Sequence, residues 1–234
     1  RCLKSRHVAM AQQGSTAAAP EEGTKAAQTS TGVEAVPPPR KCPFDCFAVL
    51  DFEATCEDGK QIAPQEIIEL PIVLVDASGK PVSEFRTYVQ PVHNPQLTAF
   101  CTELTGITQD QVANAPQWKE ALATASAWLE EELKRHGFHS CMFVTCGDWD
   151  LNQMMVRQCR TSGIKIPQRF QSWINIKRMY AAVTGYGKVG MKGMLDGLGL
   201  SLDGRHHSGL DDSRNIAKVL RALLADGKLH VSEE

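Results

Sequence analysis

The chain has no apolar stretch of about 18 residues, so it predicts no membrane-spanning helix and no membrane partner. It also lacks an excess of basic residues, because 25 Lys and Arg stand against 27 Asp and Glu, and the net charge is −2. A broad positive field is therefore excluded as the basis of binding to a phosphate-rich partner. Any such contact would have to be local.

The cysteines lack the spacing of a zinc module or a disulfide framework. None of the eight forms a Cys-x-x-Cys pair, and the close pair Cys42 and Cys46 has no matching pair downstream. Several of the others lie inside apolar runs. We therefore expect reduced, mostly buried thiols in an intracellular protein of the cytoplasm or nucleus.

Composition divides the chain near residue 40. Residues 1–40 are rich in Ala, Ser, Thr, Gln and Pro and lack apolar periodicity, so we expect a disordered N-terminal segment. Its first twenty residues contain three basic side chains and no acid, which is compatible with the remnant of an organellar targeting peptide and equally with an unselected tail. The start at Arg rather than Met is compatible with a fragment. Residues 41–230 can bury one core and predict one domain.

Two acidic residues follow the first apolar run at a spacing of two. Phe47–Leu50 predicts a buried strand, and Asp51 and Glu53 come directly after it. Side chains at i and i+2 of a strand share one face, so both carboxylates are expected to point the same way. Because Asp-x-Glu pairs are frequent, solvated acids in a loop are the alternative here.

Two more acids and a histidine accompany later elements. Asp150 follows the strand-like run at 142–146 and opens a stretch with helical apolar spacing, where ordinary helix capping by Asp148 or Asp150 is the alternative. His207 and Asp212 lie across the start of the last helix. Clustered carboxylates bind magnesium or manganese rather than zinc, and an imidazole can accept a proton from water. Together these residues predict two-metal hydrolysis of a phosphodiester.

The order Asp-x-Glu, Asp, His-x4-Asp resembles the DEDDh 3′-to-5′ exonucleases. Further motifs are similar to the Eri-type exoribonucleases (enhancer of RNA interference), and the branch that includes the prion-protein-interacting member looks most similar. The resemblance covers roughly residues 42 to 229. These motifs are 51–56, 66–69 with Pro71, 100–107, Trp149 with Asp150, 173–175 and 209–215.

The resemblance implies an α/β, ribonuclease-H-like fold, in which a mixed five-stranded sheet carries helices on both faces. The apolar patterns agree with it, since they predict strands at 47–50, 67–76, 82–89, 142–146 and 173–176 and a long helix at 117–136. The implied activity is a 3′-to-5′ exoribonuclease that releases nucleoside 5′-monophosphates from RNA 3′ ends. The alternatives are a general or DNA exonuclease and, from another class, a catalytically idle nucleic-acid-binding scaffold.

The same resemblance implies the roles of individual residues. Two Mg2+ ions, replaceable by Mn2+, would be held by Asp51, Glu53, Asp150 and Asp212, with Asp51 contacting both. Glu53 and His207 would be catalytic, and His207 would take the proton of the attacking water. The implied partner is single-stranded RNA or an RNA 3′ overhang. Its terminal nucleotide would contact Glu53, Ala54, Phe100, Trp149, Leu151 and His207.

For the two aromatics of this set, ordinary core packing is the alternative. A further motif, Gly185-Tyr-Gly187-Lys-Val-Gly190, matches the G-x-G-x-x-G fingerprint of dinucleotide-binding proteins. That motif binds pyrophosphate when a strand precedes it and a helix follows. Because residues 177–183 predict a helix, we interpret the motif as a loop and exclude a nicotinamide-dependent oxidoreductase.

Overall fold

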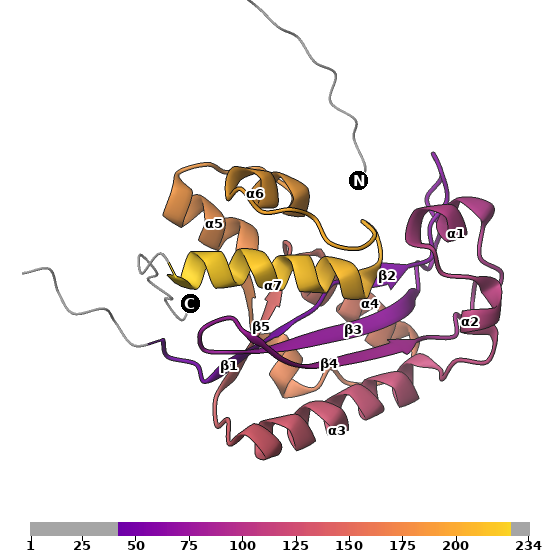
Figure 1. Cartoon of the computed structure of the whole chain (residues 1–234). Helices are drawn as coiled ribbons and strands as arrows, with labels where there is room; N and C mark the ends of the chain where they lie inside the picture. Colours follow the sequence, from indigo (N-terminus) through magenta and orange to yellow (C-terminus); the bar gives the residue numbers. More distant parts are fainter. Residues whose placement is uncertain (1–41, 226–234) are drawn as a thin grey trace, which may run out of the picture. The chain divides into compact units, whose positions relative to one another are not determined.

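The computed structural model describes residues 42–225, and the expectations for residues 1–40 lie outside this range. Its centre is a mixed sheet in the order β2-β3-β1-β5-β6, and β4 also pairs with β3 (Figure 1). β3 runs antiparallel to β1, β2 and β4, whereas β1, β5 and β6 are parallel. The strands are β1 (Cys46–Val49), β2 (Glu53–Ala54), β3 (Ile67–Asp76), β4 (Pro81–Tyr88), β5 (Cys141–Thr145) and β6 (Trp173–Asn175).

The predicted fold class is confirmed, but the predicted count of five strands is wrong. The sixth strand is β2, whose two residues are too short to produce an alternating pattern in the sequence. It exists because Glu53 pairs with Glu69 of β3. The pairing shifts register between Glu53 and Ala54, and such irregularities often occur beside active sites because they re-aim a side chain.

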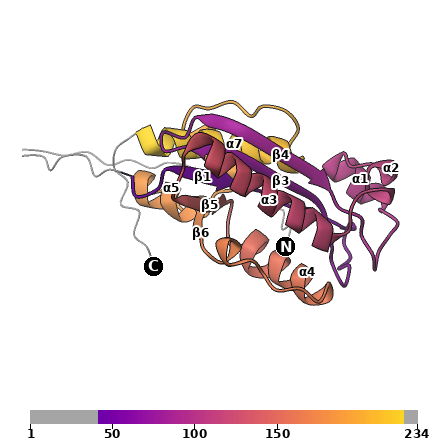
Figure 2. The same ribbon diagram turned by 90° about the horizontal axis from the view of Figure 1, so that it is seen from below.

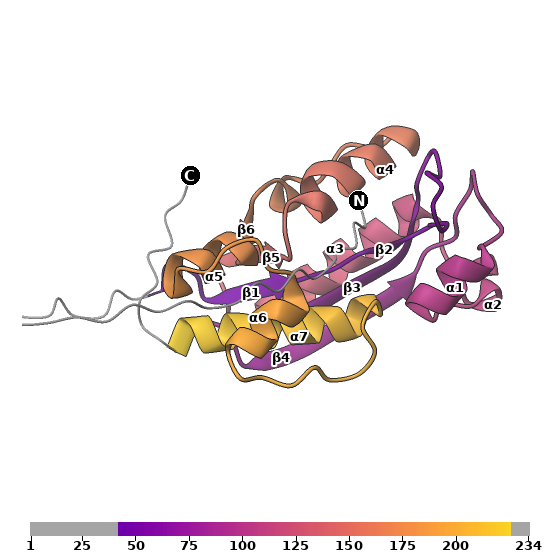
Figure 3. The ribbon, with the colours of Figure 1, turned by 90° about the horizontal axis from the view of Figure 1, so that it is seen from above.

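Helices cover both faces of the sheet. α3 and α4 pack against one face, and α5, α6 and α7 pack against the other, as seen from below in Figure 2 and from above in Figure 3. β1 and β3 are therefore almost entirely buried. The helices are α1 (Ala99–Thr105), α2 (Gln109–Ala113), α3 (Trp118–His136), α4 (Met155–Thr161), α5 (Ile176–Thr184), α6 (Met191–Gly197) and α7 (Gly209–Ala225). Two short turns add to them, η1 (Asp150–Met154, π-helical) and η2 (Gln168–Gln171, 3-10).

Strand alternation decides which face receives the acids. Leu50 and Phe52 belong to the core between the sheet and α3, where the Phe52 ring meets Trp118 edge-on at 6.0 Å. Val49 belongs to the opposite core, which includes α7. By the same alternation Asp51 and Glu53 face α7, the helix that carries Asp212.

Three features bear on the rival interpretations. Within residues 42–225, no helix is both long and apolar enough to cross a membrane. The seven cysteines in this range are free thiols. The Gly185–Gly190 motif joins α5 to α6, so a helix and not a strand precedes it, as expected from the sequence.

Candidate active site

Three carboxylates converge at the end of β1. Oxygen atoms of Asp51, Glu53 and Asp212 all lie within 4.8 Å of one another. Glu53 and Asp212 are 8% and 3% exposed, respectively. Asp51 lies just after β1, Glu53 begins β2, and Asp212 lies in the first turn of α7, about 160 positions later. The fold therefore brings together three of the four predicted metal ligands.

Asp150 joins this group through the backbone. Its Oδ1 accepts a hydrogen bond of 2.9 Å from the N–H of Phe52, the residue between Asp51 and Glu53. The alternative that Asp148 or Asp150 only caps a helix is not realised, since the Asp148 carboxylate instead accepts from Trp173 and Arg178. Asp150 begins a π-helical turn, a feature that recurs at functional sites.

His207 lies on the loop that leads into α7. Its backbone N–H donates to Asp212 Oδ2 at 2.8 Å, and its ring lies against the ring of His206 with centroids 3.9 Å apart. His207 has a φ of +67°, a left-handed conformation that is uncommon for a residue other than glycine. This strained position holds the histidine beside the carboxylate cluster.

Burial and mutual repulsion set the protonation of these acids. Burial, followed by the charges of the other acids, raises the pKa of Glu53 to about 10 and that of Asp51 well above its usual value. Burial also raises the pKa of Asp212 to about 7 and that of Asp150 to about 6. Without a cation, the cluster therefore holds protons near neutral pH.

The pKa of His207 is shifted downward, whereas those of the acids are raised. Burial lowers the pKa of His207, and the neighbouring His206 and Arg205 lower it further. The imidazole is therefore mostly neutral at neutral pH and can accept a proton, which a general base must do.

The donor set fits a hard divalent cation. All four acids offer carboxylate oxygens, which suit Mg2+ or Mn2+ better than Zn2+. Oδ1 of Asp212 is buried and has no hydrogen-bond partner among residues 42–225. A buried, unpaired carboxylate oxygen is costly unless something outside the chain neutralises it. The residues present thus fit a metal site, because they offer suitable oxygen ligands and one of these oxygens lacks a hydrogen-bond partner among residues 42–225.

The residues predicted to contact a nucleotide differ in how exposed they are. Phe100 on α1 and Trp149 before η1 are both half-buried, whereas Ala54 and Leu151 are 6% and 2% exposed and belong to the core. α1 lies beside β2, because the Cys101 thiol is 3.8 Å from the Ala54 carbonyl oxygen. Trp149 also packs against this core, so core packing accounts for part of its surface, and both aromatic side chains keep part of their surface exposed.

Sequence reasoning gave no role in the site to two charged residues near the acids, although one of them, Glu69, belongs to a motif of the family resemblance. The Lys177 charge lowers the pKa of Asp51 and of Asp150. Glu69 is fully buried on β3 and raises the pKa of Asp51 and of Glu53. An available signal for Glu69 was its place as an acid inside the apolar run of residues 67–75, since a buried charge needs a partner. For Lys177 the sequence carries no such signal.

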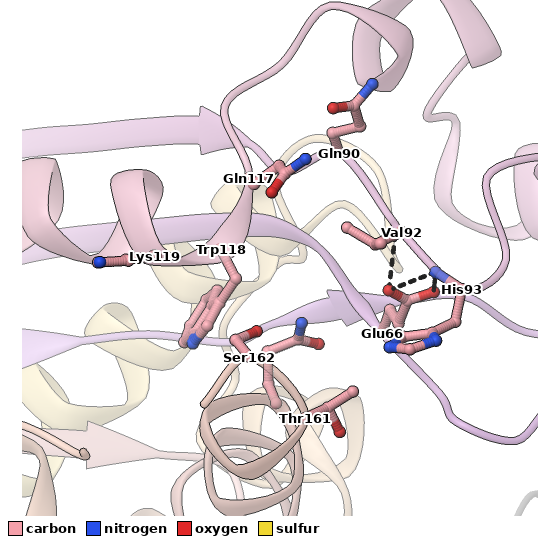
Figure 4. A pocket seen from close by; sticks show the side chains of 10 residues that line it. Glu66, Gln90, Val92, His93, Gln117, Trp118, Lys119, Thr161 and Ser162 are labelled. Carbon is pink, nitrogen blue, oxygen red and sulfur yellow. Dashed lines mark hydrogen bonds between the residues drawn. The ribbon is translucent and has the colours of Figure 1, made fainter. Parts of the chain in front are cut away.

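A separate cavity of about 220 Å³ lies between the start of β3, the loop after β4, the start of α3 and α4 (Figure 4). Its wall includes the buried Glu66, whose carboxylate accepts hydrogen bonds from the backbone N–H groups of Val92, His93 and Asn94. None of the predicted site residues lines this cavity.

Comparisons with known proteins agree with the geometry. The exonuclease family matches residues 48–220. Human ERI1 exoribonuclease 3 is 44% identical over 192 residues, which cover 81% of this chain and 56% of that protein. The chain thus spans about half the length of the curated relatives it matches.

Two solved structures are also similar. The nuclease domain of 3′hExo, a DEDDh family member bound to rAMP, is 37% identical with a TM-score of 0.76, and the match covers 83% of this chain and all of that one. A 3′-exonuclease structure that describes 3′-end specific recognition of a histone mRNA stem-loop is 37% identical with a TM-score of 0.74, covering 80% of this chain and 66% of that one. The chain belongs to the exonuclease family, as an Eri-type member of its DEDDh group.

Proposed function

We propose that this chain is a 3′-to-5′ exoribonuclease that hydrolyses RNA ends to nucleoside 5′-monophosphates. The observation that carries the proposal is the convergence of Asp51, Glu53 and Asp212 within 4.8 Å, with one Asp212 oxygen left without a partner in the described part of the chain. A core without a ligand has no need for such a cluster, because buried acids repel one another. The exonuclease domain would span residues 41–230.

The proposed cofactor is magnesium, with manganese as a substitute. Asp51, Glu53, Asp150 and Asp212 would hold two ions. When bound, these ions would neutralise the acids and stabilise negative charge on the scissile phosphate and the leaving 3′ oxygen. The raised pKa values of the acids would then fall, since the cation favours their charged forms.

His207 would act as the general base. Its lowered pKa keeps the ring neutral, so that the ring can take a proton from the attacking water. The hydrogen bond from its backbone N–H to Asp212 holds the histidine and a metal ligand in one local unit. Glu53, which begins β2, would complete the catalytic group.

The proposed substrate is single-stranded RNA or an RNA 3′ overhang. Phe100 and Trp149 would stack on the terminal bases, and Glu53, Ala54, Leu151 and His207 would complete the terminal pocket. The loop of His207 is joined to α1 by a contact between the Arg205 guanidinium and the Glu103 carbonyl. This link would let Phe100 on α1 and the general base His207 contact the same RNA end. The net charge of −2 agrees with local rather than bulk contact to phosphates.

A time course on matched, 5′-labelled single-stranded RNA and DNA tests the proposal, with magnesium and with a chelator. We expect a metal-dependent ladder that shortens by one nucleotide at a time and runs faster on RNA. An equal or faster ladder on DNA would indicate a general or DNA exonuclease. Cleavage of neither substrate would indicate a nucleic-acid-binding scaffold and overturn the proposal.

A further inference from the structure

Glu69 is a buried acid that the proposed mechanism leaves without a role. It is fully buried in the middle of the sheet and lies directly opposite Glu53 in the pairing of β2 with β3. Residues that oppose each other in an antiparallel pair point to the same face. Glu69 therefore shares the α7 face with the metal-binding acids.

The two oxygens of Glu69 contact two different elements. Oε2 accepts a hydrogen bond of 3.1 Å from the N–H of Gly209, the first residue of α7. Oε1 lies 2.7 Å from Nε of Arg86 on β4. A carboxylate suits the free N–H groups and the partial positive charge at the start of a helix. Arg86 offsets the cost of burying that carboxylate.

The contact at Gly209 is unusually close. A Cβ atom at this position would lie 2.6 Å from the Asp51 carbonyl oxygen and 3.1 Å from Glu69 Oε2. Only glycine lets the helix approach so near. The first turn of α7 is thus seated against the backbone of one metal ligand, and it carries another, Asp212, with His207 just before it.

We propose that Glu69, paired with Arg86, is a positioning residue: it seats the first turn of α7 and so sets where Asp212 and His207 lie relative to Asp51 and Glu53. The role rests on the proposed function, in which these four residues form the active site. A helix shifted by a fraction of its own turn would separate Asp212 from the acids on the strands. Small displacements of this kind cost large factors in rate.

The chain offers a matched control. Arg214 on α7 pairs with Glu84 on β4 at 2.6 Å, so it also ties this helix to the sheet. This pair is exposed, whereas Glu69 is buried beneath the first turn. Glu84→Gln makes the same chemical change as Glu69→Gln and weakens a tether of α7 that begins after Gly209. Arg214 keeps its second partner, Asp211 in the first turn, so the control leaves the contact between Glu69 and Gly209 intact.

The experiment compares Glu69→Asp, Glu69→Gln and Glu84→Gln by RNA hydrolysis and by Mn2+ affinity. Glu69→Asp keeps the charge but draws the carboxylate back from Gly209. We expect both Glu69 variants to lower kcat and Mn2+ affinity on the order of 10- to 100-fold, with KM for RNA little changed. Glu84→Gln should keep wild-type values for both.

Three outcomes would overturn the inference. Wild-type kcat and Mn2+ affinity in Glu69→Gln would show that the residue positions nothing. A full loss in Glu69→Gln with none in Glu69→Asp would show that its charge alone matters. Equal losses in Glu84→Gln would show that any tether of α7 suffices.

Two further measurements keep these outcomes interpretable. Circular dichroism reports whether Glu69→Gln is folded. If it is not, kcat and Mn2+ affinity of the folded Glu69→Asp variant, compared with Glu84→Gln, test the inference. Mn2+ affinity separates the two proposals, because a wild-type chain that binds Mn2+ but cleaves no RNA would contradict the proposed function and still test the role of Glu69.

Discussion

Glu66 and Asp212 are both buried acids beside the same sheet, but their oxygens are treated differently. Both Glu66 oxygens accept hydrogen bonds from the backbone N–H groups of residues 92–94, at 2.7 to 3.1 Å. Asp212 has one oxygen bonded to the His207 N–H and one with no partner among residues 42–225. Within residues 42–225, both oxygens of Glu66 thus have hydrogen-bond partners, whereas one oxygen of Asp212 has none.

This difference separates an acid that stabilises the fold from one that we propose holds a metal ion. Three N–H donors compensate the buried charge of Glu66, so this residue holds the loop after β4 in place. Figure 4 shows the bonds from Val92 and His93. The acids around Asp212 raise one another's pKa, so the fold keeps them together at a cost to stability. Neutralising Glu66 should therefore lower the stability of the fold, whereas neutralising Asp212 should not lower it.

Asp212→Asn should give the largest effect on activity. The substitution removes a proposed metal ligand, so we expect RNA hydrolysis to fall on the order of 10³-fold or more. The unfolding temperature in chelator should be unchanged or higher, because a buried charge with an unpaired oxygen is gone. Hydrolysis assays and thermal unfolding check the two parts. Normal hydrolysis would refute the assignment of Asp212 as a ligand.

His207→Ala should lower kcat by about 10²- to 10⁴-fold, because it removes the proposed general base. In the wild type, the lowered pKa of His207 should let activity reach its plateau by about neutral pH, and the variant should lose this dependence. His206→Ala is the matched control, since it removes the adjacent ring and should cost far less. A pH series of kcat for all three proteins measures this, and an equal loss in both variants would contradict the assignment.

Glu66→Gln should change stability and spare catalysis. An amide offers a single acceptor oxygen and places its NH2 group against N–H donors, so we expect the free energy of unfolding to fall by about 2 kcal/mol. The kcat of the folded protein should stay near the wild-type value, since Glu66 is not among the clustered acids. Urea unfolding with parallel assays measures both. A large loss of kcat in folded Glu66→Gln would remove the distinction between the two kinds of acid.

Local patterns could predict the strand acids and their common face. The i, i+2 spacing of Asp51 and Glu53 follows directly from strand geometry, and the start of the last helix was visible in its apolar repeat. The recognition of a family motif added Asp150, for which local reasoning favoured a helix cap. Its bond to the Phe52 N–H links residues 98 positions apart, and no local pattern encodes such a contact.

Tertiary contacts explain what the sequence could not predict. β2 is a strand only because β3 lies beside it, and α7 approaches the acids only because Gly209 fits against the Asp51 carbonyl. Lys177 reaches the cluster from α5, an element with no predicted part in the site. The roles of such residues can be identified only from the three-dimensional structure, because they depend on contacts between elements that are distant in the sequence.

The smallest expected effect is the pH dependence of stability without metal. The unfolded chain releases the protons of Asp212 and Glu53 near pH 4, whereas the folded protein holds them until about 7 and about 10. Their contribution to stability is therefore complete below about pH 4 and is lost as the pH rises through these values. Magnesium should oppose this loss, because it binds only the folded cluster.

Thermal unfolding between about pH 6 and pH 9, in chelator and in magnesium, measures this dependence. We expect the unfolding temperature in chelator to fall with rising pH, and magnesium to raise it most at the alkaline end. Asp212→Asn should flatten the slope, and Glu66→Gln should keep the slope at a lower overall stability. A wild-type slope in Asp212→Asn would mean that the cluster does not hold the protons, and the contrast with Glu66 would then rest on hydrogen bonds alone.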